Sequence, residues 1–336
     1  WYADFLSANQ GRQRDALLEA EKAERLDPLS NIVKSNKGEI LTMLGRFDDA
    51  RREYESIIQV DPSFVRAHAN LGHMEWTVYG RLDNAIVQFR QAAALDPGNV
   101  DYRGMLAVLW DELGGAAEAD LSLNRARAVA TGVGDVKGYE AWLKVARGNA
   151  ADAVADAEAV LAEYPTSGFE LWILALDYLR LDRAEIAVAR YRSAYPTLMD
   201  DIDPVIDFSN FWQAIDIAYV LKATGDHALA SLLLDRSMVF IQTIPRLGIG
   251  GHWYADARVF AIQGKNDRAL VALRKAVDKG WRAEWEYALK YDPVLEALHG
   301  EIKYRDIVAE LEADKVAQLK QVREMEANGE LASIPE

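Results

Sequence analysis

Cysteine is the first thing that this sequence of 336 residues lacks. Without cysteine, neither a disulfide framework nor a thiolate metal site can form. The absence does not assign a redox compartment, because a chain without cysteine is compatible with both the cytoplasm and the periplasm. Localisation is therefore left open between the two.

Positive charge is also scarce. The chain has 38 Lys and Arg against 53 Asp and Glu, which gives a formal net charge of −15. Such a balance repels a phosphate backbone and offers no basic stripe for it. We expect no nucleic-acid binding by this segment.

Long apolar runs are missing too. The most apolar stretches, such as residues 171–176, are far shorter than the roughly 20 residues that a bilayer-spanning helix needs. We expect no membrane span. Residues 1–10 contain neither Met, nor a basic n-region, nor an apolar h-region, so we expect the chain to be a processed product or a piece of a longer protein.

Two small residues recur with a fixed period. The glycines are spaced by 34 or 35 residues, at Gly11, Gly45, Gly80, Gly114 and Gly148. An alanine series keeps step with them, at Ala16, Ala50, Ala85, Ala119, Ala153 and Ala187. A period of this size is typical of a solenoid of two-helix units. Glycine suits the turn between the two helices, and alanine lets the second helix approach its neighbour closely.

Larger residues keep the same register. Tyr54, Phe89 and Tyr191 each follow an alanine by one helical turn, and we expect them to fill the space that the alanines leave. Prolines at 28, 62, 97 and 165 end one helix pair and begin the next. After residue 181 the rhythm loosens, because Asp182 replaces the turn glycine.

This pattern resembles the tetratricopeptide repeat. The second full unit carries the family's residues in one register, at Leu71, Gly72, Gly80, Ala85, Phe89, Ala92 and Pro97. The first full unit keeps Gly38, Gly45, Ala50, Tyr54 and Pro62 but has Lys37 where the family has leucine. The resemblance implies antiparallel helix pairs whose first helices, the A helices, line a concave groove.

We therefore predict an all-α protein, a right-handed α-solenoid of about eight antiparallel helix pairs. Units should begin near Asn31, Val65, Val100, Gly134, Gly168, Phe211 and Gly250, after a partial unit at residues 1–28. The solenoid spans residues 1–292, is irregular after residue 195, and has an insertion at 196–210. Capping helices at 293–328 should cover the last pair around Val271 and Leu273, followed by a tail at 329–336.

The first unit has a short A helix that begins with Trp1, Tyr2 and Phe5. A terminal repeat needs a polar outer face. We expect that something preceded this unit.

Catalytic and metal-binding patterns were sought without success. His68 and His73 are the only close histidine pair, and their i,i+5 spacing does not suit a helical zinc site. No nucleophile elbow, Walker loop or CxxC pair occurs. The acidic group Asp200, Asp201, Asp203 and Asp207 lacks the glycine and glutamate of an EF-hand, and residues 248–251 are favoured as a flexible turn. We expect no enzyme activity, no cofactor and no metal.

Aromatic residues are the remaining candidates for a binding site. Positions that resemble the groove-facing sites of the family carry Trp76, Trp142, Phe169, Trp172, Trp212, Tyr219 and Tyr254. Aromatic side chains commonly anchor a peptide because they bury a large area. The alternatives are that these rings pack between helices, or that the insertion at 196–212 covers them.

One binding mode of the family can be tested directly. Repeats that hold the acidic C-terminus of heat-shock chaperones use a clamp of lysine, asparagine and arginine. The corresponding positions here are Ser35, Glu39, Asn70, Asp101 and Met105. Only Asn70 matches, so the resemblance implies that this clamp is absent.

The sequence favours a non-catalytic interaction or scaffold module that binds a polypeptide partner, or its own upstream domain, in the groove. Residues 256–293 resemble the end of bacterial signalling proteins in which such repeats follow a winged-helix domain or a nucleotide cyclase. Two alternatives stay open. One is a small-molecule sensor or an enzyme with a pocket near 196–212, and the other is an oligomerisation scaffold, for which a homodimer is the expected form.

Overall fold

The structure is a computed structural model that describes residues 12–132, 134–199 and 202–334. Its regular elements are all helices, and no strand occurs among these residues. The all-α prediction is confirmed. In chain order the helices are α2 (Gln13–Leu26), α3 (Asn31–Met43), α4 (Phe47–Val60), α5 (Val65–Thr77), α6 (Leu82–Leu95), α7 (Val100–Glu112), α8 (Ala116–Val129), α9 (Gly134–Ala146), α10 (Ala150–Glu163), α11 (Gly168–Arg180), α12 (Ala184–Ala194), α13 (Pro196–Met199), α14 (Phe211–Thr224), α15 (His227–Ile241), α16 (Ala255–Ile262), α17 (Asn266–Asp278), α18 (Trp285–Lys290), η1 (Pro293–Leu298) and α19 (Ile302–Ala327).

The turn between the two helices of a unit has the predicted left-handed backbone. Gly45, Gly80, Gly114 and Gly148 have φ angles of 72°, 63°, 83° and 80°. Asp182 takes the same conformation, with a φ angle of 58°. Aspartate tolerates this region better than most residues that carry a side chain. The turn is therefore conserved in shape within the chain even where glycine is lost.

Packing within a unit explains the periodic alanines and the aromatic residues that follow them in the second helix. The periodic alanines are fully buried or nearly so, and Tyr54 and Phe89 are buried beside them. A Cβ added at Gly38 would lie 2.6 Å from the Tyr54 ring, and one at Gly72 would lie 2.9 Å from Phe89. The glycine in the first helix therefore makes room for the aromatic residue of the second, as close helix packing requires.

Six predicted unit starts coincide with the first residue of a helix, namely Asn31, Val65, Val100, Gly134, Gly168 and Phe211. The last unit begins at Ala255 and not near Gly250, because residues 245–253 form a hydrogen-bonded loop in front of it. The predicted first A helix, with Trp1, Tyr2 and Phe5, lies outside the described residues, as do Asp200 and Asp201.

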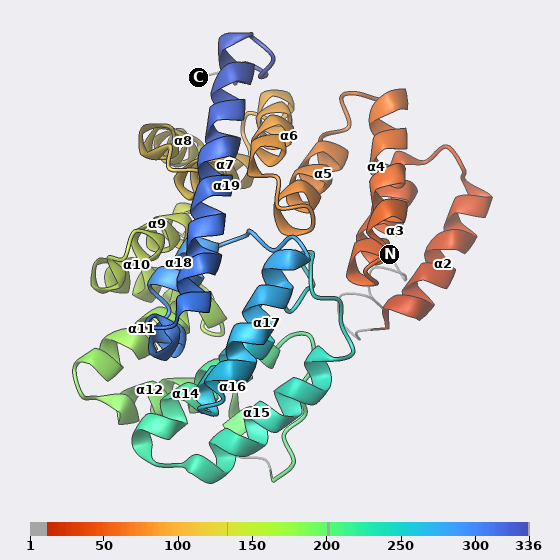
Figure 1. Cartoon of the computed structure of the whole chain (residues 1–336). Helices are drawn as coiled ribbons and strands as arrows, with labels where there is room; N and C mark the ends of the chain where they lie inside the picture. The colour runs from red at the N-terminus through yellow and green to blue at the C-terminus, as the bar shows by residue number, and fades with distance from the viewer. Residues whose placement is uncertain (1–11, 133, 200–201, 335–336) are drawn as a thin grey trace.

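The C-terminal helix α19 returns to the early repeats (Figure 1). It packs against α17 and also against α6. The Gln318 side chain donates to the Gly80 carbonyl at 2.8 Å and accepts from the Leu82 amide at 2.7 Å. Arg323 forms an ion pair with Glu118 at 2.6 Å, at the start of α8. Of the two positions predicted beneath the cap, Leu273 is buried, whereas Val271 is 67% exposed and is not covered.

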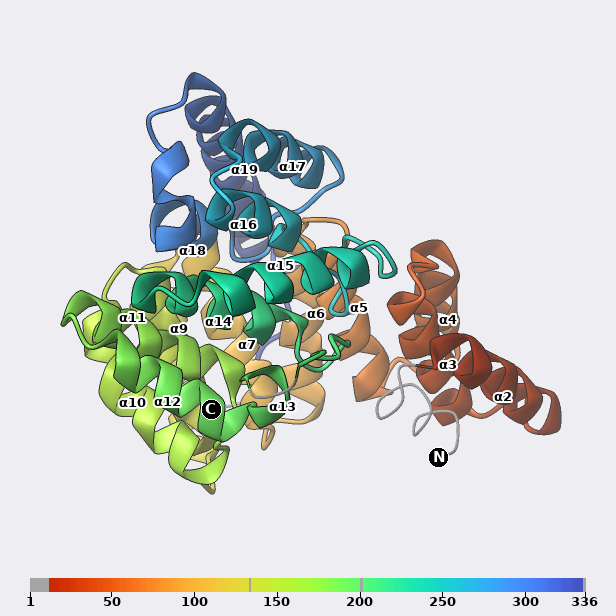
Figure 2. The ribbon, with the colours of Figure 1, turned by 90° about the horizontal axis from the view of Figure 1, so that it is seen from below.

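The chain therefore closes part of its own array. Helices α5–α19 share one hydrophobic core, whereas α2–α5 enclose a smaller one of their own. Both views show α2–α4 projecting to one side of the remaining helices (Figures 1 and 2). The C-terminal segment thus covers the inner face of the later repeats and leaves that of the first repeats uncovered.

Candidate functional site

The loop between α15 and α16 divides the inner face of the array. Its Gly248 amide donates to the Thr77 carbonyl at the end of α5, at 3.0 Å. The Trp253 indole donates to the Gly248 carbonyl at 2.8 Å, and its ring lies 6.3 Å from that of Trp76. A Cβ at Gly251 would lie 2.4 Å from the Arg246 carbonyl, so only glycine fits this bend. The loop predicted as a flexible turn is thus bonded to the second full unit.

Glu112 joins α7 to the C-terminal segment. Its carboxylate accepts the Trp76 indole N–H at 2.9 Å and the Glu284 backbone N–H at 3.1 Å. Glu112 is 5% exposed, and burial raises its pKa well above the ordinary value. A buried carboxylate needs such donors. The two hydrogen bonds therefore fix the start of α18 over the inner face.

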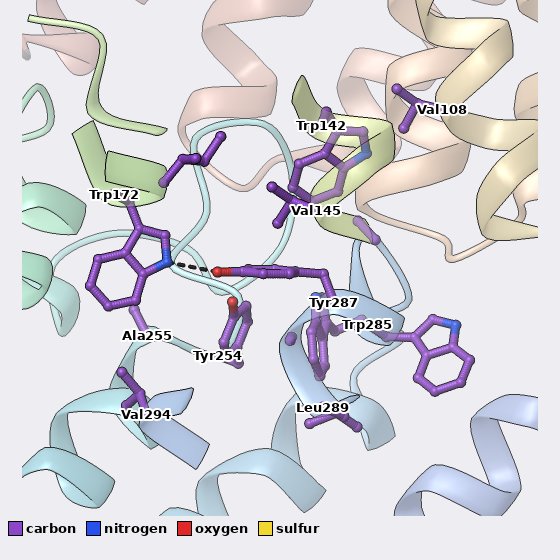
Figure 3. Close-up of a cluster of buried hydrophobic side chains, with 14 of the residues drawn as sticks. Val108, Trp142, Val145, Trp172, Tyr254, Ala255, Trp285, Tyr287, Leu289 and Val294 are labelled. Carbon is purple, nitrogen blue, oxygen red and sulfur yellow. Dashed lines mark hydrogen bonds between the residues drawn. The ribbon is translucent and has the colours of Figure 1, made fainter. Parts of the chain in front are cut away.

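The first cavity behind this loop has a volume of about 400 Å³ and mostly aromatic walls; we call it the aromatic chamber. Figure 3 shows the rings of Trp142, Trp172, Tyr254 and Tyr287 converging from α9, α11, α18 and the loop before α16. The Trp172 indole donates to the Tyr287 hydroxyl at 2.6 Å. The full lining is Trp142, Gly168, Phe169, Trp172, Trp212, Gln213, Asp216, Trp253, Tyr254, Arg258, Glu284, Tyr287 and Asp292.

A buried ion-pair network forms one wall of the aromatic chamber. Arg258 lies between Asp216, at 2.8 Å, and Asp292, at 2.9 Å. Its guanidinium carbon is 4.9 Å from the centroid of the Trp172 ring. Burial raises the pKa of Asp216 to about 6, although the charge of Arg258 acts against this rise. The two carboxylates stabilise a cation that burial alone would disfavour.

Glu284 has no such partner. No hydrogen bond or ion pair of its carboxylate is present among the residues that the structure describes. Its backbone is left-handed, with a φ angle of 59°, which is rare for a residue with a side chain. Burial raises its pKa to about 8. An unpartnered carboxyl group on strained backbone is a common mark of a functional position.

A second cavity, of about 500 Å³, adjoins the aromatic chamber; we call it the side cavity. It shares Trp142 and Glu284 with the aromatic chamber. Tyr139 donates to Asp101 at 3.1 Å in its wall. The remaining lining residues are Trp76, Met105, Val108, Gly138, Tyr164 and Glu170.

A third cavity lies on the open side of the loop, between α3 and α5, with a volume of about 380 Å³; we call it the open cleft. Asn70 donates to Glu39 at 2.7 Å, and Arg66 forms two hydrogen bonds with the same carboxylate. Its walls are Asn36, Glu39, Ile40, Thr42, Met43, Tyr54, Asn70, His73, Met74, Thr77 and Ile249. Asn70, the one clamp residue that matches, thus donates to Glu39 of the same chain and not to a ligand carboxylate.

Six of the seven predicted aromatic residues line the aromatic chamber or the side cavity. Trp142, Phe169, Trp172, Trp212 and Tyr254 line the aromatic chamber. Trp76 lines the side cavity, and Tyr219 packs against Trp172 with ring centroids 5.6 Å apart. Trp253 of the 245–254 loop and Tyr287 of α18 line the same chamber. The role of the seven predicted residues in binding stays a prediction.

Sequence reasoning missed Trp253, Arg258, Glu284 and Tyr287. It also missed Asp216, the ion-pair partner of Arg258. The sequence did contain a signal for these two residues, because each stands among apolar neighbours, in α14 and in α16. An isolated charge in an apolar helix is expected to have a buried partner. The loop position of Glu284 carried no such signal.

The described residues offer neither a metal site nor a membrane-spanning helix. No group of three or more His, Asp or Glu side chains there could hold a metal ion. His73 packs edge-on against Phe89, and burial lowers its pKa to about 4. No helix in the described ranges is long and apolar enough to cross a membrane.

Comparison with known proteins agrees with the helical repeats. A family model of the tetratricopeptide repeat matches residues 8–63 and 43–100. A curated relative, the small glutamine-rich tetratricopeptide repeat-containing protein 2 of Mycosarcoma maydis, is 26% identical over 119 residues. The match covers 35% of this chain and 34% of that protein. Tetratricopeptide repeats are therefore present in the N-terminal part, and such repeats generally serve protein–protein interaction or scaffolding.

Solved structures show the same fold over most of the chain. The human IFIT1 dimer with m7Gppp-AAAA is 16% identical, with a TM-score of 0.53, over 96% of this chain and 79% of that one. The APC/C hetero-tetramer Cut9–Hcn1 is 12% identical, with a TM-score of 0.50, over 89% of this chain and 52% of that one. At these identities the likeness shows an α-solenoid and nothing about ligands.

Proposed function

We propose that the chain is a non-catalytic interaction module that holds a polypeptide in the open cleft. The observation that carries this proposal is the position of the cleft. It lies in the units that match the tetratricopeptide repeat, on the side of the 245–254 loop that the C-terminal segment leaves open. The first helices of such units present a curved surface suited to a peptide.

The walls of the open cleft favour a particular kind of peptide. Ile40, Met43, Met74 and Ile249 offer an apolar floor and rim. Met side chains adapt to varied apolar partners because they are flexible and polarisable. The net charge of −15 favours a neutral or basic segment. One or two large apolar side chains, bound in the micromolar range, would fit this surface.

The ligand of the structurally similar IFIT1 is not transferred. Its printed ligand, m7Gppp-AAAA, carries phosphates and RNA. The aromatic chamber and the side cavity here are lined by five carboxyl groups and one arginine. Such a lining repels phosphate. A polypeptide partner, or an upstream domain of the same chain, therefore remains the proposal.

The test is a selection of displayed peptides on the full chain, followed by calorimetry with the selected peptide. Ile249→Asp, at the rim of the open cleft, should weaken binding by about tenfold or more. Val271→Asp is the matched control, because Val271 is similarly exposed and lines none of the three cavities. Equal affinity of both variants, or no selected peptide at all, would contradict the open cleft as the binding site.

We also propose that the module is the regulatory part of a larger bacterial signalling protein. This rests on the resemblance of residues 256–293 to such proteins. Sequencing the uncut gene tests it directly, since an attached winged-helix or cyclase domain is expected. A homodimer, the state of the IFIT1 neighbour, stays a further proposal for sedimentation measurements.

A further inference from the structure

The aromatic chamber and the side cavity form one acidic space. Five carboxyl groups line them together, from Asp101, Glu170, Asp216, Glu284 and Asp292. Arg258 is the only cationic side chain among the described residues that line either cavity. Its charge is already matched twice, by Asp216 and Asp292. The lining therefore carries a surplus of negative charge that no other cationic side chain of the described lining balances.

The walls of this space are suited to a positive charge. The rings of Trp142, Phe169 and Tyr287 stand together, with centroids 5.1 Å and 5.8 Å from Trp142. The faces of aromatic rings attract cations, and tryptophan does so most strongly. Arg258 already uses the face of Trp172 in this way. The remaining rings and the cavity of about 400 Å³ leave room for a second cation.

Two buried donors point to a ligand with an oxygen acceptor. Trp142 is 9% exposed and Arg258 is 4% exposed. The Trp142 indole N–H and the Nη2 group of Arg258 have no hydrogen-bond partner within the described part of the chain. In Figure 3 the nitrogen edge of Trp142 faces the side of Val108, which lines the side cavity. Buried donors without partners are uncommon, and a bound ligand or water would satisfy them.

We propose that the aromatic chamber binds an organic cation, an alkylammonium or guanidinium group, whose charged nitrogen lies between the Glu284 carboxylate and the ring of Trp142. Glu284 supplies the opposite charge, because its carboxylate has no ion pair with any residue that the structure describes. An oxygen of the ligand that reaches the side cavity accepts from the Trp142 indole, which faces that cavity. The group can belong to a free amine or to a basic side chain of a polypeptide. This inference does not depend on the open cleft.

Other titratable groups line the same two cavities and determine the electrostatic potential there. On α7 and α9 these are Asp101 and Tyr139, and on α11 it is Glu170. From α14 and α16 they are Asp216 and Arg258, and from the C-terminal segment Tyr287 and Asp292. Glu112 lies behind Glu284 and accepts its backbone N–H. All but Arg258 are acidic or neutral, so they favour a cation and oppose an anion.

A pair of probes of equal shape tests the proposal. Choline and 3,3-dimethylbutan-1-ol differ in one atom, a charged nitrogen against a neutral carbon. Titrated by calorimetry into the full chain at about pH 8.5, choline should bind about 5- to 30-fold more tightly. Glu284→Gln should reduce choline affinity by about tenfold and leave the neutral alcohol unchanged. The exposed Glu185→Gln on α12 removes the same charge outside the cavities and should change neither.

The outcomes separate clearly. Equal binding of choline and the alcohol, an unchanged affinity in Glu284→Gln, or no saturable choline binding at about 10 mM would each overturn the proposal. An unaltered thermal midpoint shows that Glu284→Gln remains folded. A third probe, N-acetyl-lysine methylamide, identifies the source. Tighter binding than choline assigns the site to a basic side chain of a polypeptide, and weaker binding assigns it to a free amine.

Discussion

Replacing Gln318 with alanine tests the contact that closes the array. Gln318 lies on α19, and its side chain meets the start of α6, which is 236 residues away in sequence from the Leu82 amide. The first amides of a helix have no partner within that helix. Arg81, at the N-cap of α6, makes no side-chain cap hydrogen bond. Gln318 therefore takes the place of an N-cap residue, from a distant part of the chain.

The size of the effect follows from the groups left behind. Gln318→Ala leaves the Leu82 N–H without its acceptor and the Gly80 carbonyl without its donor. Loss of an N-cap costs about 0.5–2 kcal/mol, and an unsatisfied buried backbone group costs about 1–3 kcal/mol. Because Gln318 is only 5% exposed, water does not freely replace it. We expect a loss of roughly 2–4 kcal/mol in the free energy of unfolding.

Urea denaturation measures this loss, followed by tryptophan fluorescence and by far-UV circular dichroism. Coincident curves from the two probes justify a two-state treatment. Gln321→Ala is the matched control on the same helix, because its exposed contact with Arg81 is long, at 3.4 Å. That variant should stay within about 0.5 kcal/mol of the original. Equal urea midpoints for Gln318→Ala and the original chain would refute the reasoning.

Four further predictions concern packing, helix content, the C-terminal helix and pH. Ala85→Trp should lower stability by about 1–3 kcal/mol or more, since Ala85 is fully buried, and an unchanged thermal midpoint would mean that the repeat register is wrong. Far-UV circular dichroism should report more than half helix, and a lower value would contradict the all-α solenoid. Deleting everything after Gly300 removes Gln318 and Arg323 and should cause aggregation; a soluble, equally stable product would show that α19 is dispensable. Choline affinity should rise with pH through about pH 8 and level off roughly one unit higher, because burial raises the pKa of Glu284 to about 8 and only its ionised form attracts a cation; Glu284→Gln should abolish this slope, and a slope that survives in the variant would assign it to another group.

Local features of the fold were predictable because they repeat. Gly45 and Ala85 recur at a fixed period, and each recurrence reports the same turn or the same close contact. The packing of α19 against α6 has no repeated pattern in the sequence that predicts it. It depends on single contacts, such as Gln318 with Gly80, that join segments more than 200 residues apart and occur once. Spacing cannot reveal a contact that is not repeated.

The candidate site was predictable to the same extent. Aromatic residues of the A helices, such as Trp142 and Trp172, were named from their likeness to groove-facing positions of the family, and they line the aromatic chamber. Glu284 sits in an irregular loop, and its importance comes from what surrounds it in space. The sequence therefore predicted the aromatic walls but neither the charge within them nor the segment that covers them.

The aromatic chamber depends on the closure of the array by the C-terminal segment, which supplies Glu284, Tyr287 and Asp292. The exchange rate of the Leu82 amide tests this closure most directly. If α19 did not dock at the N-terminus of α6, this amide would exchange quickly with solvent, because it has no acceptor within α6. The Phe47 amide at the start of α4 is the internal reference, since no acceptor for it is present among the described residues. Hydrogen exchange followed by NMR should show Leu82 protected far more strongly than Phe47 in the original chain, and equally fast in Gln318→Ala. Equal exchange of Leu82 and Phe47 in the original chain would mean that α19 does not dock on α6 and that the array is open.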